Sequence, residues 1–192
     1  KKFLRFKLFL NNFKKNKNTS IFGFVGRLNT DKGIITLLEV FDRHLKTFPN
    51  NKLVLIGPIE LEQKYLEILY KKPESFLHLD YTNYIYNYLP HFKSIILPSL
   101  REGFGSVVIE AGACKVPCIS TEVSGPIDFI KHNVNGYFIK KESKSDLLKA
   151  INHFSRNNDK VKKLGEKAYE LVKQKYEKKY VENNFLKEFN LL

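Results

Sequence analysis

Short runs of apolar residues alternate with longer amphipathic segments along most of this chain of 192 residues. Apolar runs bounded by polar residues, glycine or proline predict buried strands over residues 20–26, 52–56, 76–79, 94–97, 116–120 and 136–139. Segments with apolar residues at helical spacing predict helices over 33–48, 60–71, 84–89, from about 106, and over 145–156, 159–174 and 177–190. Strands and helices therefore alternate, and the last part of the chain is helical.

This alternation predicts an α/β fold, namely a Rossmann-like, doubly wound sheet of about six parallel strands with helices on both faces and a helical C-terminal tail. We expect a basic linker, or the remnant of an interdomain connection, over residues 1–19, the Rossmann-like domain over 20–175, and a C-terminal helix over 176–192. Such sheets bind ligands beyond the carboxyl ends of their strands. The loops that leave the sheet at this edge are 26–33, 57–59, 98–105 and 121–128.

One stretch of the chain combines a strand, a glycine loop and a helix. After the strand at 94–97, a loop with Gly103 and Gly105 leads into the helix predicted from about residue 106. The unpaired amide groups of the first helical turn, with the positive end of the helix dipole, then point beyond the end of the strand, where phosphate binds. The glycines keep side chains away, so that backbone N–H groups are able to approach a phosphate or a sugar hydroxyl closely.

Two glutamates bracket this loop. Glu102 comes directly before the first glycine, and Glu110 lies four residues beyond Ser106, on the same face of the helix. A carboxylate suits vicinal diols because it only accepts hydrogen bonds, so Glu110 suits a ribose and Glu102 a hexose. A capped core helix with a surface glutamate at each end fits the same pattern, since a lone Gly-x-Gly is weak evidence.

Two cations follow the first predicted strand. Arg27 lies at the tip of the strand and Lys32 at the entry to the next helix. Such a pair around a turn is able to grip a pyrophosphate, Arg through its planar fork and Lys as a point charge. The sequence contains no cluster of metal-ligand residues, so we expect these cations and a helix N-terminus to do what magnesium does in other phosphate sites. The alternative is that both are surface charges near a cap at Thr30 or Asp31.

The chain is strongly basic. Its formal net charge is +13, nearly all of it from lysine. A basic excess is typical of proteins that bind nucleic acid, anionic lipid or a phosphorylated substrate, and abundant Lys, Asn, Phe and Ile also fit a compositional bias. The basic residues are spread along the chain without a nucleic-acid motif or an aromatic stacking platform, so we expect no nucleic-acid partner.

Lysines crowd the N-terminus among phenylalanines and leucines. This segment suits the surface of an anionic membrane, and equally the remnant of an interdomain connection. No apolar run approaches the roughly 18 residues of a membrane span, and no signal peptide is visible. We expect a soluble, cytoplasmic protein, with peripheral contact at the inner face of the membrane left open. Cys114 and Cys118 are expected as reduced core residues.

Several of these segments together resemble one known family. They are Phe24–Leu28 with Lys32–Gly33, Pro98–Ser99 leading to Glu102–Gly105 and Glu110–Ala111, then Val116–Pro117, Gly125 and Asn135–Gly136. In order and spacing, from about residue 20 to the last helix, they are similar to the C-terminal domain of retaining group 1 (family 4) glycosyltransferases of the GT-B fold. The two-glutamate pattern is specific when Arg27 and Lys32 accompany it.

In that family this domain binds the nucleotide-sugar donor, so the resemblance implies roles for the matched residues. Arg27 and Lys32 would hold the diphosphate, Glu110 the ribose and Glu102 the transferred sugar. The implied catalytic residues are Arg27, Lys32 and Glu102. The implied donor-binding residues are Gly26, Gly103, Phe104, Gly105, Ser106, Val107, Glu110 and Tyr81. The base would lie near Leu79 to Tyr81 and the loop after Gly57. No metal or cofactor is implied, only a UDP-sugar or another nucleoside diphosphate sugar as substrate.

Three positions depart from the family pattern. Lys115 stands where the family usually has glycine after the helix, which puts the geometry of that helix end in question but not the ligand contacts. Asp80 replaces a usual glycine near the expected base site. Asp128 holds a position where Glu is common and is one methylene shorter.

The resemblance implies displacement of a nucleoside diphosphate with retention at the anomeric carbon, and transfer of a hexose-type sugar. The acceptor, a glycan or glycolipid of a surface polysaccharide such as capsule or lipopolysaccharide, would come from the side of an N-terminal GT-B domain. The sequence has no methionine, even at position 1, so we expect an excised domain that turns over little or nothing alone. The rival predictions are a basic binding module for nucleic acid or a membrane surface, and a GT-B sugar-nucleotide epimerase or phosphorylase relative.

Overall fold

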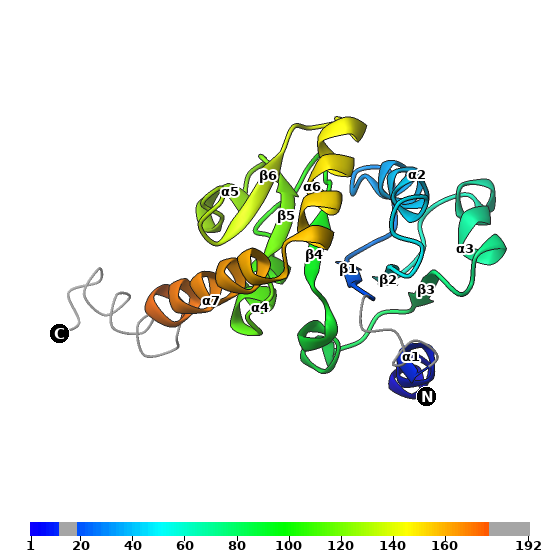
Figure 1. Cartoon of the computed structure of the whole chain (residues 1–192), viewed down its shortest axis with the longest axis horizontal. Coiled ribbons are helices and arrows are strands. Elements are labelled where there is room, and N and C mark those ends of the chain that lie inside the picture. Colours follow the sequence, from blue (N-terminus) through cyan, green and yellow to red (C-terminus); the bar gives the residue numbers. More distant parts are fainter. Residues whose placement is uncertain (12–18, 177–192) are drawn as a thin grey trace.

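A single parallel sheet organises the computed structural model of this chain, which describes residues 1–11 and 19–176. The six strands are β1 (Ile21–Val25), β2 (Lys52–Ile56), β3 (Phe76–Leu79), β4 (Ser94–Leu97), β5 (Cys118–Thr121) and β6 (Gly136–Ile139). They lie in the order β3-β2-β1-β4-β5-β6, and every neighbouring pair is parallel (Figure 1). This is the strand order of a doubly wound Rossmann fold, so the predicted fold class is confirmed.

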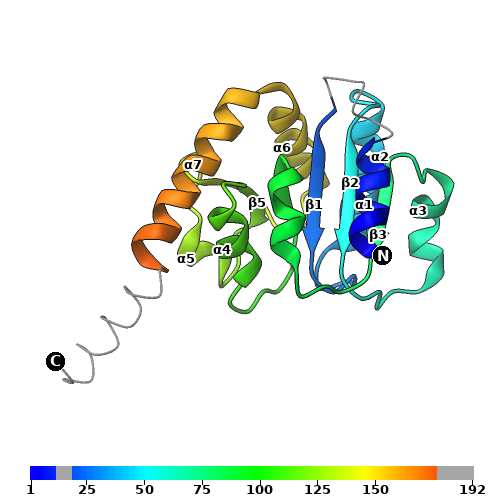
Figure 2. The same ribbon diagram turned by 90° about the horizontal axis from the view of Figure 1, so that it is seen from below.

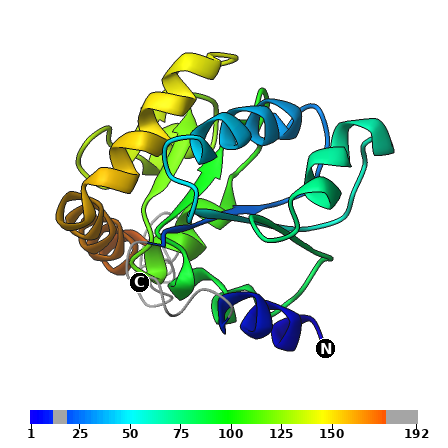
Figure 3. The same ribbon diagram turned by 45° about the vertical axis from the view of Figure 1, so that its right-hand side comes forward.

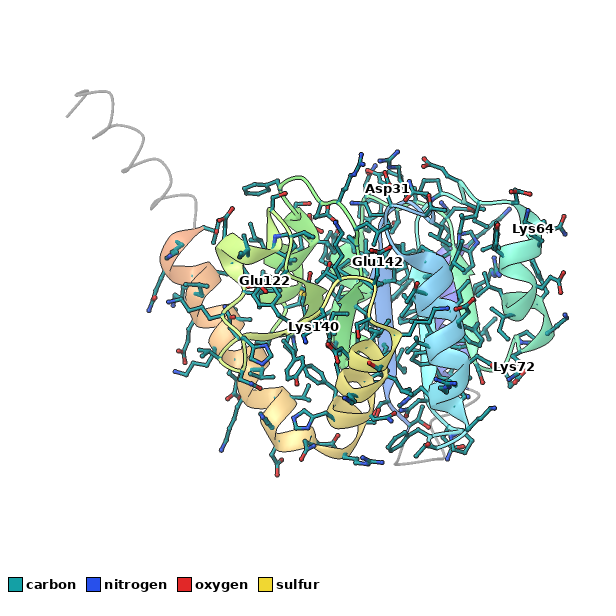
Figure 4. The ribbon with its side chains drawn as sticks, turned by 90° about the horizontal axis from the view of Figure 1, so that it is seen from above. Asp31, Lys64, Lys72, Glu122, Lys140 and Glu142 are labelled. Carbon is teal, nitrogen blue, oxygen red and sulfur yellow. The ribbon has the colours of Figure 1, made fainter. Side chains whose placement is uncertain are left out.

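Helices cover both faces of the sheet. They are α1 (Lys2–Asn11), α2 (Ile34–Leu45), α3 (Glu67–Lys71), α4 (Ser106–Ala113), α5 (Pro126–Phe129), α6 (Lys144–Arg156) and α7 (Asn158–Lys175). Helices α2, α3 and α6 lie on one side, and α1, α4 and α7 lie on the other (Figures 2 and 3). Within these layers α2 packs against α6, and α4 packs against α7. Figure 4 looks onto the α2 and α6 layer.

Most strand residues are apolar, because both sheet faces are covered. Every residue of β2 and β4 is buried, and so are the three central residues of β1. Gly23 in the middle of β1 leaves room for an aromatic ring: a Cβ added there would lie 2.5 Å from Cδ2 of Phe92. Phe92 therefore packs directly onto the central strand.

The N-terminal segment differs from the expected linker, because residues 2–11 form helix α1. Phe6 and Phe9 are buried, and the Phe6 ring lies 5.1 Å from the ring of Tyr88 and 6.0 Å from that of Phe92, between ring centroids. Phenylalanines at positions 3, 6 and 9 recur near the helical period, so they supply the apolar face on which the helix docks. The remaining residues of the expected linker, 12–18, lie outside the described part of the chain.

Four further segments differ from prediction. The helix expected over 60–71 is a short 3₁₀ turn, Gln63–Leu66, followed by α3, because Ile59 still forms a parallel bridge with Leu28. The helix expected over 84–89 is two 3₁₀ turns, Ile85–Asn87 and Leu89–His91, since Pro90 lacks an N–H to continue a helix. Strand β5 starts at Cys118 rather than at 116, and α5 was not predicted.

The C-terminal part of the chain is helical through α6 and α7, as predicted, up to Lys175. The helix expected over 177–190, and most of the expected C-terminal unit over 176–192, fall outside the described residues. Within residues 1–11 and 19–176, none of the helices has the length and apolar character required to cross a membrane.

Candidate functional site

The site forms where the winding of the sheet reverses, between β1 and β4. The connection from β1 leads to α2 on one face, and the connection from β4 leads to α4 on the opposite face (Figure 3). The two loops diverge at the carboxyl ends of these strands, which leaves a crevice between them. Asp31, in the loop after β1, marks this edge of the sheet in Figure 4.

The loops that follow β1 and β2 touch through their backbones. A Cβ added to Gly57 would lie 1.9 Å from the carbonyl oxygen of Gly26, and Gly57 has a φ of +145°. Only glycine fits such a position. The Leu28 amide also donates to the Pro58 carbonyl at 2.8 Å. These contacts bring Arg27 and the loop after β2 to one wall of the crevice.

The loops that follow β1 and β4 are joined in the same manner. A Cβ on Gly33, whose φ is +68°, would lie 2.2 Å from the carbonyl oxygen of Pro98. The amide of Leu100 donates to the carbonyl of Asp31 at 2.7 Å. Lys32, which lies between these two contacts, is therefore held against the segment that carries the first glutamate.

Lys32 and Glu102 form an ion pair across the crevice, with Nζ 2.7 Å from Oε2. Their side chains are 15% and 14% exposed, so the pair is largely shielded from solvent. The hydroxyl of Ser99 donates to the same carboxylate oxygen at 3.4 Å, and the hydroxyl of Ser124 donates to the backbone carbonyl of Glu102 at 2.8 Å. Glu102 is thus fixed by its side chain and by its backbone.

Helix α4 starts at the crevice. Gly105, with a φ of +69°, directly precedes it and turns the chain into the helix. The amides of Ser106 and Val107 belong to the first turn, where no carbonyl four residues back is available inside the helix, and both residues line the cavity. A Cβ on Gly125 would lie 2.2 Å from the carbonyl oxygen of Gly103, so the loop before α5 supports the glycine loop from behind.

These groups surround one cavity of about 620 Å³. Glu110 lines it one turn beyond Ser106. Arg27 lines it from the loop after β1, where its Nη1 lies 3.3 Å from Oε2 of Glu60, and the side-chain amide of Asn29 donates to the same oxygen at 2.9 Å. Both members of the Arg27–Glu60 pair are solvent-accessible, so this ion pair is weak.

The cavity gathers most of the site residues expected from the sequence. The expected residues that line it are Gly26, Arg27, Lys32, Tyr81, Glu102, Gly105, Ser106, Val107 and Glu110. Gly103 and Phe104 do not line it, since both are exposed at the tip of the loop, and the Phe104 side chain is 71% exposed. The structure therefore does not place these two expected donor-binding residues in the cavity lining.

The wall contributed by the loop after β3 went largely unpredicted. Thr82, Asn83 and Ile85 line the cavity there, next to Tyr81. The hydroxyl of Tyr81 donates to Oδ1 of Asn83 at 2.5 Å, which leaves the amide NH₂ of Asn83 available to other acceptors. Their position directly after a parallel strand was the available signal, because all such loops leave the sheet at one edge.

The cavity offers three kinds of chemistry in one place. Arg27 and Lys32 supply positive charge, and the amides at the start of α4 supply backbone donors beside the positive end of a helix dipole. Glu102 and Glu110 supply acceptors for hydroxyl groups. This combination suits an elongated ligand that carries both phosphate and sugar.

Comparison with known proteins gives consistent matches. The family model for glycosyl transferases group 1 matches residues 6–171. The capsular polysaccharide biosynthesis glycosyltransferase CapM of Staphylococcus aureus is 30% identical over 181 residues, which are 88% of this chain and 47% of CapM. The poly(ribitol-phosphate) alpha-N-acetylglucosaminyltransferase of Staphylococcus aureus (strain COL) is 28% identical over 173 residues, with coverage of 88% and 35%.

Solved structures are similar over nearly the whole chain. A crystal structure of Staphylococcus aureus TarM, a mutant in complex with fondaparinux, alpha-GlcNAc-glycerol and UDP, has a TM-score of 0.80 at 28% identity, over 90% of this chain and 36% of TarM. The C-terminal domain of the group 1 glycosyl transferase LpcC from Francisella tularensis has the same fold, with a TM-score of 0.75 at 22% identity over 88% of this chain and 92% of that domain.

The chain spans about half, or less, of the length of the curated relatives it matches. It spans most of the LpcC domain, which is a C-terminal domain. The family model covers both loops that carry the cavity residues, from Gly26 to Glu110. The chain therefore belongs to the glycosyl transferases of group 1 and corresponds to a C-terminal domain of their GT-B fold.

Proposed function

We propose that this chain is the donor-binding half of a retaining glycosyltransferase, and that its ligand is a nucleoside diphosphate sugar. One observation carries the proposal: a single cavity at the switch point of the sheet is lined by two cations, two glutamates and the first amides of a helix. A diphosphate needs the cations and amides, whereas a ribose and a hexose need the acceptors.

The diphosphate would lie between Arg27, Lys32 and the start of α4. Lys32 lines the cavity on the side of the glycine loop, and Arg27 lines it on the side of the loop after β2. As the glycosidic bond opens, negative charge grows on the leaving diphosphate, and preorganised positive groups stabilise that charge. A gain of about 1.4 kcal/mol in transition-state binding is worth a tenfold rate increase, so loss of either cation is expected to be severe.

The nucleoside and the sugar would occupy the two ends of the cavity. Glu110, deeper along α4, would accept hydrogen bonds from the ribose hydroxyls, and Glu102 would accept them from the transferred sugar. The base would lie against the loop after β3, near Tyr81. We favour UDP as the nucleotide, supported by the UDP present in the complex of TarM, which is 28% identical to this chain.

The acceptor would be a glycan or a lipid-linked glycan. Relatives of this chain are named for the biosynthesis of capsular polysaccharide and of teichuronic acid. Since the chain spans 47% of CapM, an N-terminal domain across the cleft would supply the acceptor site. We expect the chain alone to bind donor and to transfer little or no sugar until that domain is added.

Calorimetric titration with UDP-sugars tests the proposal. Arg27→Ala and Glu110→Ala should each weaken binding at least tenfold, because charge-assisted hydrogen bonds are typically worth about 1.5–3 kcal/mol. Matched controls are Lys64→Ala and Glu122→Ala, which remove an exposed cation and an exposed carboxylate outside the cavity. Unchanged affinity in both cavity variants would refute the assigned roles.

The same titration separates the proposal from a general anion-binding module. A module that binds nucleic acid or membrane only through its charge would ignore the sugar nucleotide, and its affinity would fall steeply with salt. A thermal-shift panel of nucleotide sugars then identifies the base and the sugar, because ligand binding to the folded state raises the melting temperature.

A further inference from the structure

Helix α1 presents an unusual outer face. A spacing of i, i+3, i+4, i+7 places four residues on one side of the helix: Lys1, which directly precedes it, and Leu4, Arg5 and Leu8. The two leucines are 61% and 55% exposed, and both cations are exposed as well. Figure 3 shows α1 at the periphery of the molecule, with no other described element on its outer side.

The opposite side of α1 already anchors the helix to the domain. Phe6 is completely buried and Phe9 nearly so. The ring of Phe3 meets the ring of Tyr88 edge-on, with 5.4 Å between centroids, and Phe6 contacts Tyr88 and Phe92. The exposed leucines are therefore not required to hold the helix in place, and no packing within the described chain accounts for them.

Exposed tyrosines continue this surface beyond the helix. Tyr81, Tyr84 and Tyr86 are each more than half exposed in the segment after β3. Lys2 Nζ donates to the backbone carbonyl of Tyr81 at 2.6 Å, and a hollow of about 490 Å³ is lined by both segments. We call the combined surface the α1 face; its residues are Lys1, Lys2, Leu4, Arg5, Lys7, Leu8, Tyr81, Tyr84 and Tyr86.

The α1 face is positive and contains no acid. The sequence has no Asp or Glu from residue 1 to residue 30, and none from 81 to 101. Asp80 is the nearest acid in the chain to the exposed tyrosines. Four cations, at positions 1, 2, 5 and 7, accompany the two leucines. The face therefore attracts anions strongly while it exposes apolar and aromatic groups.

We propose that the α1 face docks onto the surface of an anionic phospholipid bilayer. The exposed leucines suit the acyl boundary, and the exposed tyrosines suit the level of the headgroups. The cations would meet anionic headgroups around them. A nucleic acid would satisfy the cations, but it would leave the leucines in water, so charge and apolar exposure together favour lipid.

Docking in this manner would bring the site close to the membrane. Tyr81, Thr82 and Asn83 line both the hollow beneath α1 and the cavity of the candidate site, so the two are separated by one loop. An acceptor held at the bilayer surface would then lie near the donor cavity. The docking proposal does not depend on the proposed transferase function, because it rests on the exposed leucines and cations of α1, which do not line the donor cavity, and because its ligand is different.

Co-sedimentation of the 192-residue chain with vesicles tests the proposal. Vesicles of phosphatidylcholine alone are compared with vesicles that also contain phosphatidylglycerol. We expect binding to the anionic vesicles only, and weaker binding at high salt because the contributing charges are exposed. The double variant Leu4→Ser with Leu8→Ser, and the charge-reversal variant Lys1→Glu with Arg5→Glu, should each lower the partition coefficient at least tenfold.

Two control variants match these changes elsewhere on the surface. Ile127→Ser with Val134→Ser removes two exposed apolar residues, and Lys162→Glu with Lys163→Glu reverses two exposed charges on α7. Both controls should bind vesicles within about twofold of the parent chain. Circular dichroism checks that every variant is folded.

A heparin column separates lipid recognition from simple charge attraction. The leucine variant should lose vesicle binding and keep its retention on heparin, because its charges are intact. The proposal is overturned if the leucine variant sediments with anionic vesicles as strongly as the parent. It is also overturned if the parent binds heparin and single-stranded RNA but not vesicles, which would assign the face to a polyanion instead.

Discussion

Nζ of Lys32 lies 2.7 Å from Oε2 of Glu102, although 70 positions separate the two residues in the chain. The contact joins the loop after β1 to the loop after β4, and little of either side chain reaches solvent. Each charge is therefore neutralised by the other before a ligand arrives. In the proposed binding mode, a diphosphate that binds Lys32 would compete with Glu102, so the carboxylate would lower the affinity for phosphate.

Glu102→Gln should therefore change two affinities in opposite directions. Without the carboxylate, Lys32 is available to phosphate, so the affinity for UDP should rise about threefold to tenfold, as expected for the loss of a competing ion pair worth about 1 kcal/mol. The preference for a UDP-sugar over UDP should fall, because the glutamine offers a weaker acceptor to the sugar hydroxyls. Calorimetry with both ligands measures the two effects.

Glu122→Gln is the matched control for this experiment, since Glu122 is an exposed glutamate that does not line the cavity. It should leave both affinities unchanged. If Glu102→Gln instead weakens UDP and UDP-sugar by the same factor, Glu102 supports the loop structure and does not contact the sugar.

Helix α4 packs against α7, and just beyond the end of α4 the backbone of Lys115 lies directly against Gly165 of α7. A Cβ at residue 165 would lie 2.0 Å from the backbone oxygen of Lys115. We expect Gly165→Ala to lower the free energy of unfolding by about 2–3 kcal/mol, measured by urea denaturation, because a backbone segment must move. At an exposed helix position without such a contact, Gly→Ala would raise the free energy of unfolding by about 1 kcal/mol, so the sign of the measured effect tests the contact. Glu166→Ala, at the exposed neighbour, should change the stability by less than about 0.5 kcal/mol.

Lys115 itself has an unfavourable backbone. Its φ is +59°, and the amide of Val116 donates to the carbonyl of Ala111 at 2.9 Å, which is the helix-ending motif that favours glycine at this position. Lys115→Gly removes this backbone strain but also removes the contact between Lys115 Nζ and the Tyr169 ring. The net effect should be a rise of about 0.5–1 kcal/mol in the free energy of unfolding. Lys163→Gly, within α7, should instead lower the stability by about 1 kcal/mol. Thermal and urea denaturation of both variants give the comparison.

Much of the site could be predicted because local sequence and topology agree there. Most strand residues are apolar and are bounded by glycine, proline or polar residues, so the strand ends and the loops beyond them follow approximately from the sequence. The family pattern has glycine where this chain has Lys115. The structure explains this preference, because the backbone of Lys115 adopts the left-handed conformation that glycine adopts most easily. The pairing of Arg27 with the segment from 102 to 110 depends on β1 lying beside β4, an order that only the family resemblance implied.

Contacts that depend on long-range packing were not predicted from the sequence. The ion pair between Glu60 and Arg27 was not predicted, because the sequence pattern placed Glu60 at the start of a helix. In the structure Ile59 forms a parallel bridge with Leu28, so the chain at Glu60 is still extended beside the loop that carries Arg27. Helix α1 was hidden because its lysines and leucines suggested a linker, although its phenylalanines have helical spacing. Phe104 is 71% exposed between Gly103 and Gly105, which the apolar character of its side chain does not predict.

A buried polar network lies on the other face of the sheet, around His44. Nδ1 of the fully buried ring lies 2.5 Å from Oδ1 of Asn152, and Nε2 lies 2.9 Å from Nδ2 of Asn51 and 3.3 Å from the hydroxyl of Ser155. These partners fit a neutral imidazole that carries its proton on Nδ1. The network joins α2, the residue before β2, and α6. Burial, together with the positive charge of Arg156, lowers the pKa of His44 from 6.5 to about 4.

Stability should consequently depend on pH between 6.5 and 4. The unfolded chain protonates residue 44 near pH 6.5, whereas the folded protein resists protonation until about pH 4. The unfolded state thus binds more protons in this window, and the stabilisation present above pH 6.5 is lost as the pH falls, by about 3 kcal/mol in total. His44→Gln should be less stable at neutral pH and should lose less stability on acidification.

The pKa of His153 is also lowered by burial, and its smaller contribution is common to both proteins. Urea denaturation across the window measures the two slopes. Equal slopes for the parent and His44→Gln would mean that the buried imidazole is not the group that limits stability in acid.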